Sequence, residues 1–88
     1  MFVKVLAELL GTFFFLSVIL ATGEAIPIAI ALGAAIFMTA KVSGGHLNPA
    51  VSTMMFAKGA IDSSTYISYV IAQVIGGLLA LYFFGLTL

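Results

Sequence analysis

One stretch of the chain combines polar residues and glycines at a spacing that could do chemistry. It reads Ser-Gly-Gly-His-Leu-Asn-Pro-Ala-Val-Ser over residues 43–52 and interrupts an otherwise apolar sequence. Asn is a favoured helix N-cap and Pro a favoured first helical residue, so Asn48 and Pro49 predict a helix start. Lys58 followed by Gly59 is typical of a helix end. The predicted helix of residues 49–58 is about 15 Å long, half of a bilayer core of about 30 Å.

The residue types in this stretch favour hydrogen bonding to a neutral solute. Irregular backbone at membrane depth is stable only where protein buries it or water wets it, so the loop implies an aqueous path. Gly44 and Gly45 allow the backbone to present successive carbonyl acceptors. Asn48 can cap its helix through the side-chain oxygen while its amide N–H groups donate to a solute. The positive end of the helix dipole disfavours cations at the same point, which suits water or a similar molecule.

The composition places the chain in a membrane and excludes several classes of function. Of its 88 residues, 64% are hydrophobic and 7% charged, and the mean hydropathy is +1.33, outside the range of soluble domains. The three Lys are balanced by three acidic residues, so the net charge is zero and gives no indication of a nucleic acid partner. The chain has no Cys and a single His, which argues against disulfides, thiol chemistry and a metal site. We expect no enzyme and no cofactor.

The apolar pattern predicts an all-α membrane protein that forms one unit over residues 1–88. We expect three transmembrane helices, together with a re-entrant loop and half-helix; in chain order these are about 2–21, about 26–42, 43–58 and about 66–86. An alternative for the first segment is a cleaved signal peptide, because Lys4 precedes the apolar run and residues 21–23 are small. Glu8 inside the run argues against that alternative.

The charges and small residues predict how the helices are oriented and packed. Lys4, Lys41 and Lys58 all fall on one face of the membrane, opposite Glu24, so the positive-inside rule predicts a cytoplasmic amino terminus and an outer carboxyl terminus. Lys41 either lines the cytoplasmic entrance or extends toward the headgroups, and we favour the second. Small residues that recur at helical spacing predict close helix contacts, and they are Ala7 and Gly11, then Ala25, Ala29 and Gly33, then Ser68, Ala72, Gly76 and Ala80.

Residues 43–52 resemble the first Asn-Pro-Ala loop of the major intrinsic proteins, the aquaporins and glycerol facilitators. The agreement continues through Ala-Glu-Leu-Leu-Gly-Thr at 7–12 and Ile-Ala-Gln-Val-Ile-Gly-Gly at 71–77. Three motifs in the right order are specific to this family. The resemblance covers the whole chain but only the amino-terminal half of the family's fold. In such pores, selectivity comes from the diameter, the hydrogen-bonding lining and positive helix ends.

The resemblance implies a role for each matched residue. Asn48, Pro49 and Ala50 would form the central constriction, and Gly44, Gly45 and His46 would supply carbonyl oxygens toward the cytoplasmic mouth. The His46 ring either lines this entrance or is held by hydrogen bonds inside the loop. Glu8 would brace the loop backbone from within the membrane, and Gln73 would form a hydrogen bond between helices. Ile28, outside the matched motifs, is a candidate for the narrow region of the pore.

The chain departs from the family in two respects. A complete pore needs two halves in inverted orientation, and this sequence supplies one. The family's filter arginine follows the second Asn-Pro-Ala, whereas Val51 follows the motif here. The other half could belong to a longer channel of which this is the front part, to a separate chain, or to a second copy inserted in the opposite orientation. The lysine bias disfavours the second copy.

The predicted function is therefore half of a passive channel for water or small neutral solutes such as glycerol. Its expected partners are the lipid bilayer and either a second half-channel or a homo-oligomer. The alternative is a small hydrophobic assembly or membrane-perturbing protein, in which the polar loop is only a connection. A coupled transporter is a third possibility, which has Glu8 alone as a membrane-embedded titrating group.

Overall fold

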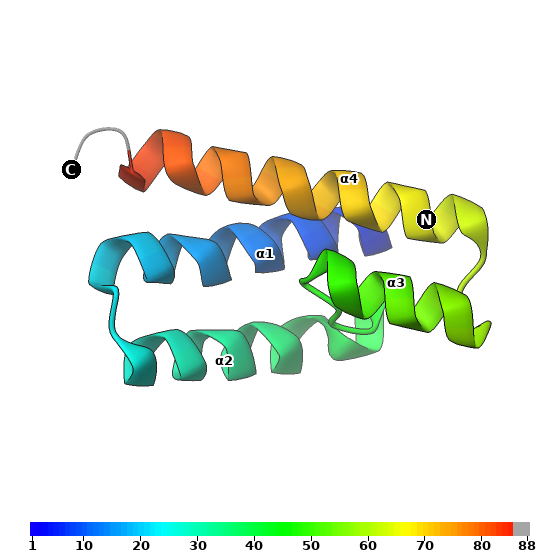
Figure 1. Cartoon of the computed structure of the whole chain (residues 1–88), viewed down its shortest axis with the longest axis horizontal. Coiled ribbons are helices and arrows are strands. Elements are labelled where there is room, and N and C mark those ends of the chain that lie inside the picture. Colours follow the sequence, from blue (N-terminus) through cyan, green and yellow to red (C-terminus); the bar gives the residue numbers. More distant parts are fainter. Residues whose placement is uncertain (86–88) are drawn as a thin grey trace.

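Three long helices and one short helix make up the part of the chain that the structure describes. The computed structural model describes residues 1–85 and contains, in order, α1 (Phe2–Thr22), α2 (Ala25–Ser43), α3 (Pro49–Lys58) and α4 (Ser63–Ala80), which continues as a π-helical turn over Leu81–Gly85 (Figure 1). No strand occurs within these residues. The predicted all-α class is confirmed. The predicted end of the last span, at about residue 86, lies outside the described residues.

The last long helix begins at Ser63, earlier than the expected residue 66. Asp62 is its N-cap, and the Asp62 side chain accepts a hydrogen bond from the Thr65 N–H at 2.8 Å. An aspartate at this position satisfies one of the unpaired N–H groups of the first turn. The polar residues 63–65 therefore belong to the helix and not to the connection.

Three helices are long and apolar enough to cross a bilayer. They are Phe2–Thr22 with 21 residues, Ala25–Ser43 with 19 and Ser63–Gly85 with 23. The longest dimension of the molecule is 39 Å, more than the thickness of about 30 Å of a hydrocarbon core. Large apolar side chains such as Phe2, Phe37 and Met38 are highly exposed, as expected for surfaces that face lipid or another subunit. The chain is an integral membrane protein.

Helix α1 lies between the other two long helices. It packs against α2 on one side and α4 on the other, while α3 packs against α4 (Figure 1). The backbones of α1 and α4 approach each other closely at Gly76, where an added Cβ would lie 2.7 Å from the Leu9 carbonyl oxygen. Only a residue without a side chain allows this backbone contact.

Within the described chain, the small-residue pattern was correct for Gly11 of α1 and for most of the α4 residues, whereas Ala7 and Ser68 are only half-buried, and it was wrong for α2. Ala72, Gly76 and Ala80 are buried. The predicted α2 residues Ala25, Ala29 and Gly33 are all exposed; the buried small residues of that helix are instead Ala31 and Ala35. Both α2 sets share the same spacing, so spacing alone could not decide which face turns toward α1.

Candidate functional site

The loop between α2 and α3 folds back through left-handed backbone conformations. Gly44, Gly45 and Leu47 have φ values of 96°, 64° and 55°. Glycine adopts this region freely, whereas a leucine in it is strained by about 1–2 kcal/mol. The Leu47 side chain is 2% exposed and lies against α1, because a Cβ added at Gly11 would come within 2.7 Å of Leu47 Cδ2. Burial in the helix packing thus holds the strained residue in place.

Asn48 ends this loop and starts the short helix. It is extended, with φ −157° and ψ 126°, and its side-chain oxygen accepts from the Ala50 N–H at 2.7 Å. Pro49 follows as the first helical residue. The Asn48 amide nitrogen makes no hydrogen bond within residues 1–85, and Asn48, Pro49 and Ala50 are all exposed. The tip of α3 therefore presents an amide donor at the positive end of a helix.

The Glu8 carboxylate is fully buried beneath the loop. Glu8 Oε2 accepts from the Ser43 hydroxyl at 2.6 Å and from the His46 N–H at 3.0 Å. Glu8 Oε1 accepts from the Leu47 N–H at 2.8 Å and from the Gln73 amide at 2.9 Å. A carboxylate has about four lone-pair positions, so each of them is matched by a donor. One α1 side chain therefore joins the loop and α4.

A second set of hydrogen bonds runs from Gln73 to the loop histidine. Gln73 Nε2 lies 2.9 Å from Glu8 Oε1 and 2.9 Å from Ser52 Oγ. Ser52 Oγ in turn lies 2.8 Å from His46 Nδ1. Ser52 and Glu8 have no exposed surface, and Gln73 is 2% exposed. The network thus links α1, the loop, α3 and α4 inside the helix packing.

Tyr69 of α4 also contacts the loop. Its hydroxyl donates to the Ser43 carbonyl oxygen at 2.6 Å, and its ring meets the His46 ring edge to face at a centroid distance of 5.1 Å. An edge-to-face pair of this kind fixes the plane of the imidazole. His46 is 8% exposed, so its ring is both held inside the loop and accessible at one edge.

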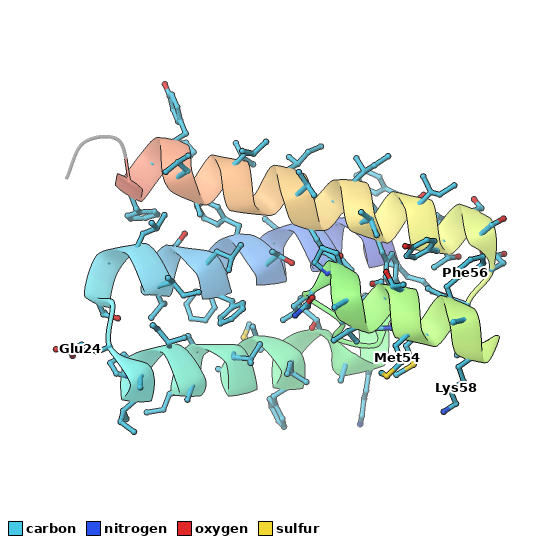
Figure 2. All side chains as sticks on the ribbon, in the orientation of Figure 1. Glu24, Met54, Phe56 and Lys58 are labelled. Atoms are coloured by element: carbon cyan, nitrogen blue, oxygen red, sulfur yellow. The ribbon has the colours of Figure 1, made fainter. Side chains whose placement is uncertain are left out.

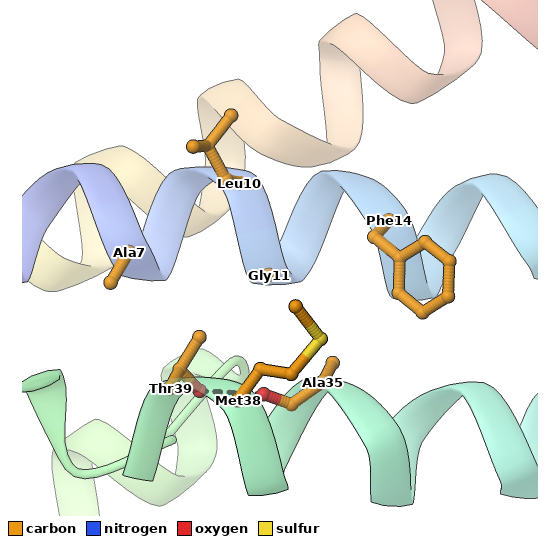
Figure 3. A pocket seen from close by; sticks show the side chains of 7 residues that line it. All are labelled: Ala7, Leu10, Gly11, Phe14, Ala35, Met38 and Thr39. Atoms are coloured by element: carbon orange, nitrogen blue, oxygen red, sulfur yellow. Dashed lines mark hydrogen bonds between the residues drawn. The ribbon is translucent and has the colours of Figure 1, made fainter. Parts of the chain in front are cut away.

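Two cavities border these elements. One, of about 400 Å³, lies beyond the tip of α3 between α1 and α4; its lining includes Thr12, Asn48, Pro49 and Gln73. The other, of about 390 Å³, lies between α1 and α2 and is lined by Ala7, Leu10, Gly11, Phe14, Ala35, Met38 and Thr39 (Figure 3). In this second cavity the one hydroxyl, that of Thr39, already donates to the Ala35 carbonyl at 2.8 Å. Of these two cavities, only the one beyond α3 is lined by Asn48.

The predicted site residues gather around the loop, except one. Glu8, Gln73, Gly44, Gly45, His46, Asn48, Pro49 and Ala50 lie in the loop, at the tip of α3 or in the network beneath it. Ile28 is near the amino-terminal end of α2, whereas the loop follows the carboxyl-terminal end of that helix. It lines neither cavity. The described structure does not bring Ile28 to the loop.

Sequence reasoning gave no individual role to four residues that shape the site: Ser43, Leu47, Ser52 and Tyr69. Ser52 could have been found, because it is a hydroxyl four residues after Asn48 in a helix expected inside a membrane, where polar groups need partners. Tyr69 lies one turn before Gln73, so it shares the face that carries the predicted bond between helices. The strained Leu47 left no signal in the sequence, since leucine rarely adopts φ near 55°.

The three lysines and Glu24 lie at opposite ends of the molecule, and Asp62 is at the lysine end. Glu24, between α1 and α2, lies at the end opposite Lys58 of α3 (Figure 2). Lys4 is in the first turn of α1, and Lys41 in the last turn of α2, so both belong to the Lys58 end. The described residues contain no group of three or more His, Cys, Asp or Glu side chains that could hold a metal ion.

Comparisons with known proteins find relatives among glycerol facilitators and aquaporins. Over 86 residues the chain is 43% identical to glycerol uptake facilitator protein-like 6 of Lactiplantibacillus plantarum, covering 88% of this chain and 40% of that protein. It is 36% identical over 92 residues to aquaporin Z of Photorhabdus laumondii, with the same two coverages. A match of 44% over 63 residues to aquaporin TIP4-2 of Zea mays covers 69% of this chain and 24% of that protein.

The chain spans about 40% of the length of the first two relatives. No solved structure matches it significantly. The model of the family described as major intrinsic protein matches residues 1–87, nearly the whole sequence. The chain therefore belongs to the major intrinsic protein family.

Proposed function

We propose that this chain forms one half of a passive transmembrane channel for water or small neutral solutes such as glycerol. The observation that carries the proposal is the exposed tip of α3. There the Asn48 oxygen caps the helix, and the amide nitrogen of the same side chain has no partner within the described residues. A solute that passes this tip meets a hydrogen-bond donor in a positive field, which favours neutral molecules over cations.

The length of α3 supports a position of this tip near the middle of the bilayer. Its 10 residues give about 15 Å at 1.5 Å per residue, which is half of a core of about 30 Å. A loop at that depth needs satisfied backbone groups or water. Glu8 supplies two of the acceptors, for the N–H groups of His46 and Leu47. We infer that Glu8 braces the loop and that the Asn48 side of it is wet.

A second half would complete the channel. The cavity beyond the tip of α3 is open between α1 and α4, and the relatives named above are more than twice as long as the segment they share with this chain. The second half could follow in the same polypeptide, belong to another chain, or be a second copy of this one. A second copy in inverted orientation conflicts with the lysines, which all lie at one end. The same lysines support a cytoplasmic amino terminus.

The proposal is tested by osmotic shrinkage of proteoliposomes followed by light scattering. The chain is reconstituted alone and together with the carboxyl-terminal remainder of the L. plantarum relative, expressed separately. We expect faster water flux from the pair, abolished in Asn48→Leu. Asn48→Ser is the matched variant, because serine keeps an N-cap oxygen but has no amide donor, and its flux should fall without loss of helix content.

The same vesicles test the alternative of a membrane-perturbing assembly. They carry a trapped anionic dye whose release reports leakage. A channel of the proposed kind retains the dye while water leaves. Equal dye release from wild-type chain and Asn48→Leu, with no selective water flux, would favour the membrane-perturbing assembly and exclude the proposed channel.

A further inference from the structure

The direction of the hydrogen bonds beneath the loop determines which ring nitrogen of His46 carries a proton. The starting point is Glu8, whose carboxylate oxygens only accept. The Gln73 group that faces Glu8 Oε1 at 2.9 Å must therefore be the amide nitrogen and not the amide oxygen. This orientation turns the Gln73 oxygen away, and within the described residues that oxygen is one of two buried side-chain atoms without a partner.

The second proton of the same amide fixes the role of Ser52. Gln73 Nε2 lies 2.9 Å from Ser52 Oγ, so the serine oxygen accepts this bond. Its own hydroxyl proton then has one acceptor among residues 1–85, His46 Nδ1 at 2.8 Å. Because a nitrogen that accepts a hydrogen bond carries no proton, neutral His46 must be protonated on Nε2.

His46 Nε2 is also the accessible edge of the ring. It has no hydrogen-bond partner in the described part of the chain, yet it is absent from the buried unpaired atoms, which are Thr12 Oγ1 and Gln73 Oε1. It lies beside the exposed Gly44, where an added Cβ would come within 3.2 Å of it. The packing of the ring against Tyr69 holds this edge in one direction.

We propose that Ser52 and Gln73 are positioning residues that hold His46 as its Nε2–H tautomer, and that Nε2–H is a fixed donor to the solute at the Gly44 end of the loop. The solute role rests on the proposed channel function. The tautomer does not, because it follows from the donors and acceptors of the chain alone. A histidine that exchanged between its two neutral tautomers would present Nε2 sometimes as a donor and sometimes as an acceptor, so a solute would not meet a fixed donor there.

The chain has one histidine, so ring ¹⁵N labelling of histidine gives the signals of His46 alone. The spectrum is recorded on the full chain in lipid nanodiscs at about pH 8.5, where free histidine is neutral. We expect the attached proton on Nε2, with Nδ1 bare, and an excess of this tautomer of about fivefold to tenfold from one hydrogen bond. A proton on Nδ1 in the wild type would overturn the proposal without any variant.

Ser52→Ala removes the donor to Nδ1 and should reduce that excess by the same factor. Thr53→Ala is the matched control on the next residue of α3, because the Thr53 hydroxyl bonds to the Pro49 carbonyl and the Tyr66 hydroxyl and not to His46. It should leave the tautomer unchanged. An unaltered tautomer ratio in Ser52→Ala would show that Ser52 does not position the ring.

The solute role is tested separately by water flux of the same variants paired with the second half. We expect Ser52→Ala to lose flux and Thr53→Ala to keep it. If the tautomer shifts in Ser52→Ala while flux stays at the wild-type level, Nε2–H is not the solute's donor. If the wild-type pair carries no flux, the proposed channel function is refuted. The tautomer assignment is tested independently by the ¹⁵N spectrum.

Discussion

Replacing Glu8 by glutamine should lower the free energy of local opening of the loop by about 3 kcal/mol. Glutamine has the same shape but only one acceptor oxygen. If the oxygen of the new glutamine takes the place of Glu8 Oε1, it still accepts from the Leu47 N–H and the Gln73 amide. The NH2 group of the new glutamine then takes the place of Glu8 Oε2. It can donate to the Ser43 hydroxyl, which rotates to accept, but it leaves the His46 N–H without an acceptor. A buried unpaired N–H costs about 1–3 kcal/mol, and the two remaining bonds lose about 1 kcal/mol each of charge assistance. The lower cost of burying an amide offsets part of this sum.

Amide hydrogen exchange of the chain in nanodiscs measures the effect directly. A local opening that is easier by about 3 kcal/mol should speed exchange of the His46 and Leu47 N–H groups by about 100-fold. The amides in the middle of α1 serve as the internal reference. Glu24→Gln is the control, since it makes the same chemical change on an exposed residue between α1 and α2. Unchanged exchange at both loop positions in Glu8→Gln would refute the argument that the carboxylate holds the loop.

Two further variants test the packing and the start of α4. Gly76→Ala should lower the free energy of unfolding in detergent by about 1–3 kcal/mol, because the added Cβ meets the Leu9 carbonyl oxygen at 2.7 Å. Gly33→Ala is the control. Its Cβ meets nothing within 4 Å, so this variant should be neutral or stabilising. The bond from the Thr65 N–H lowers the pKa of Asp62 below its ordinary value of 3.8. The stability that the Asp62 carboxylate adds to α4 is therefore fully present above pH 3.8 and is lost as the pH falls through the lowered pKa. Because Asn does not titrate in this range, Asp62→Asn should remove this acid dependence from the hydrogen exchange of the Thr65 amide.

The half-helix is the element whose bounds the sequence predicted best, because they depend on interactions between neighbouring residues. The predicted range of 49–58 matches α3, Pro49–Lys58, because Asn48, Pro49 and Gly59 act on neighbouring backbone groups and need no distant partner. The same holds for the three long apolar segments, whose existence depends on composition. The beginning of α4 was predicted at about residue 66, three residues late, because Asp62 and the serines after it are all suitable N-caps; the structure shows that Asp62 is the cap.

The site was only partly accessible to the same reasoning. Family resemblance pointed to Glu8 as a brace, but its four donors come from two separate parts of the chain and could not be counted before the helices were packed. Leu47 in a left-handed conformation is a case where tertiary packing overrides local preference. The face of α2 that meets α1 also depended on packing, because two sets of small residues in that helix have the same period.

By itself, the sequence determined that the chain enters a membrane, crosses it with three helices and interrupts them with a short helix begun by Asn48. These features depend on hydropathy and on contacts between near neighbours. Only the tertiary structure decided how Glu8, Gln73, Ser52 and His46 connect, and therefore which way each hydrogen bond points. The physical reason is that a hydrogen bond has a direction. That direction is fixed only when groups far apart in the sequence are brought within about 3 Å of each other.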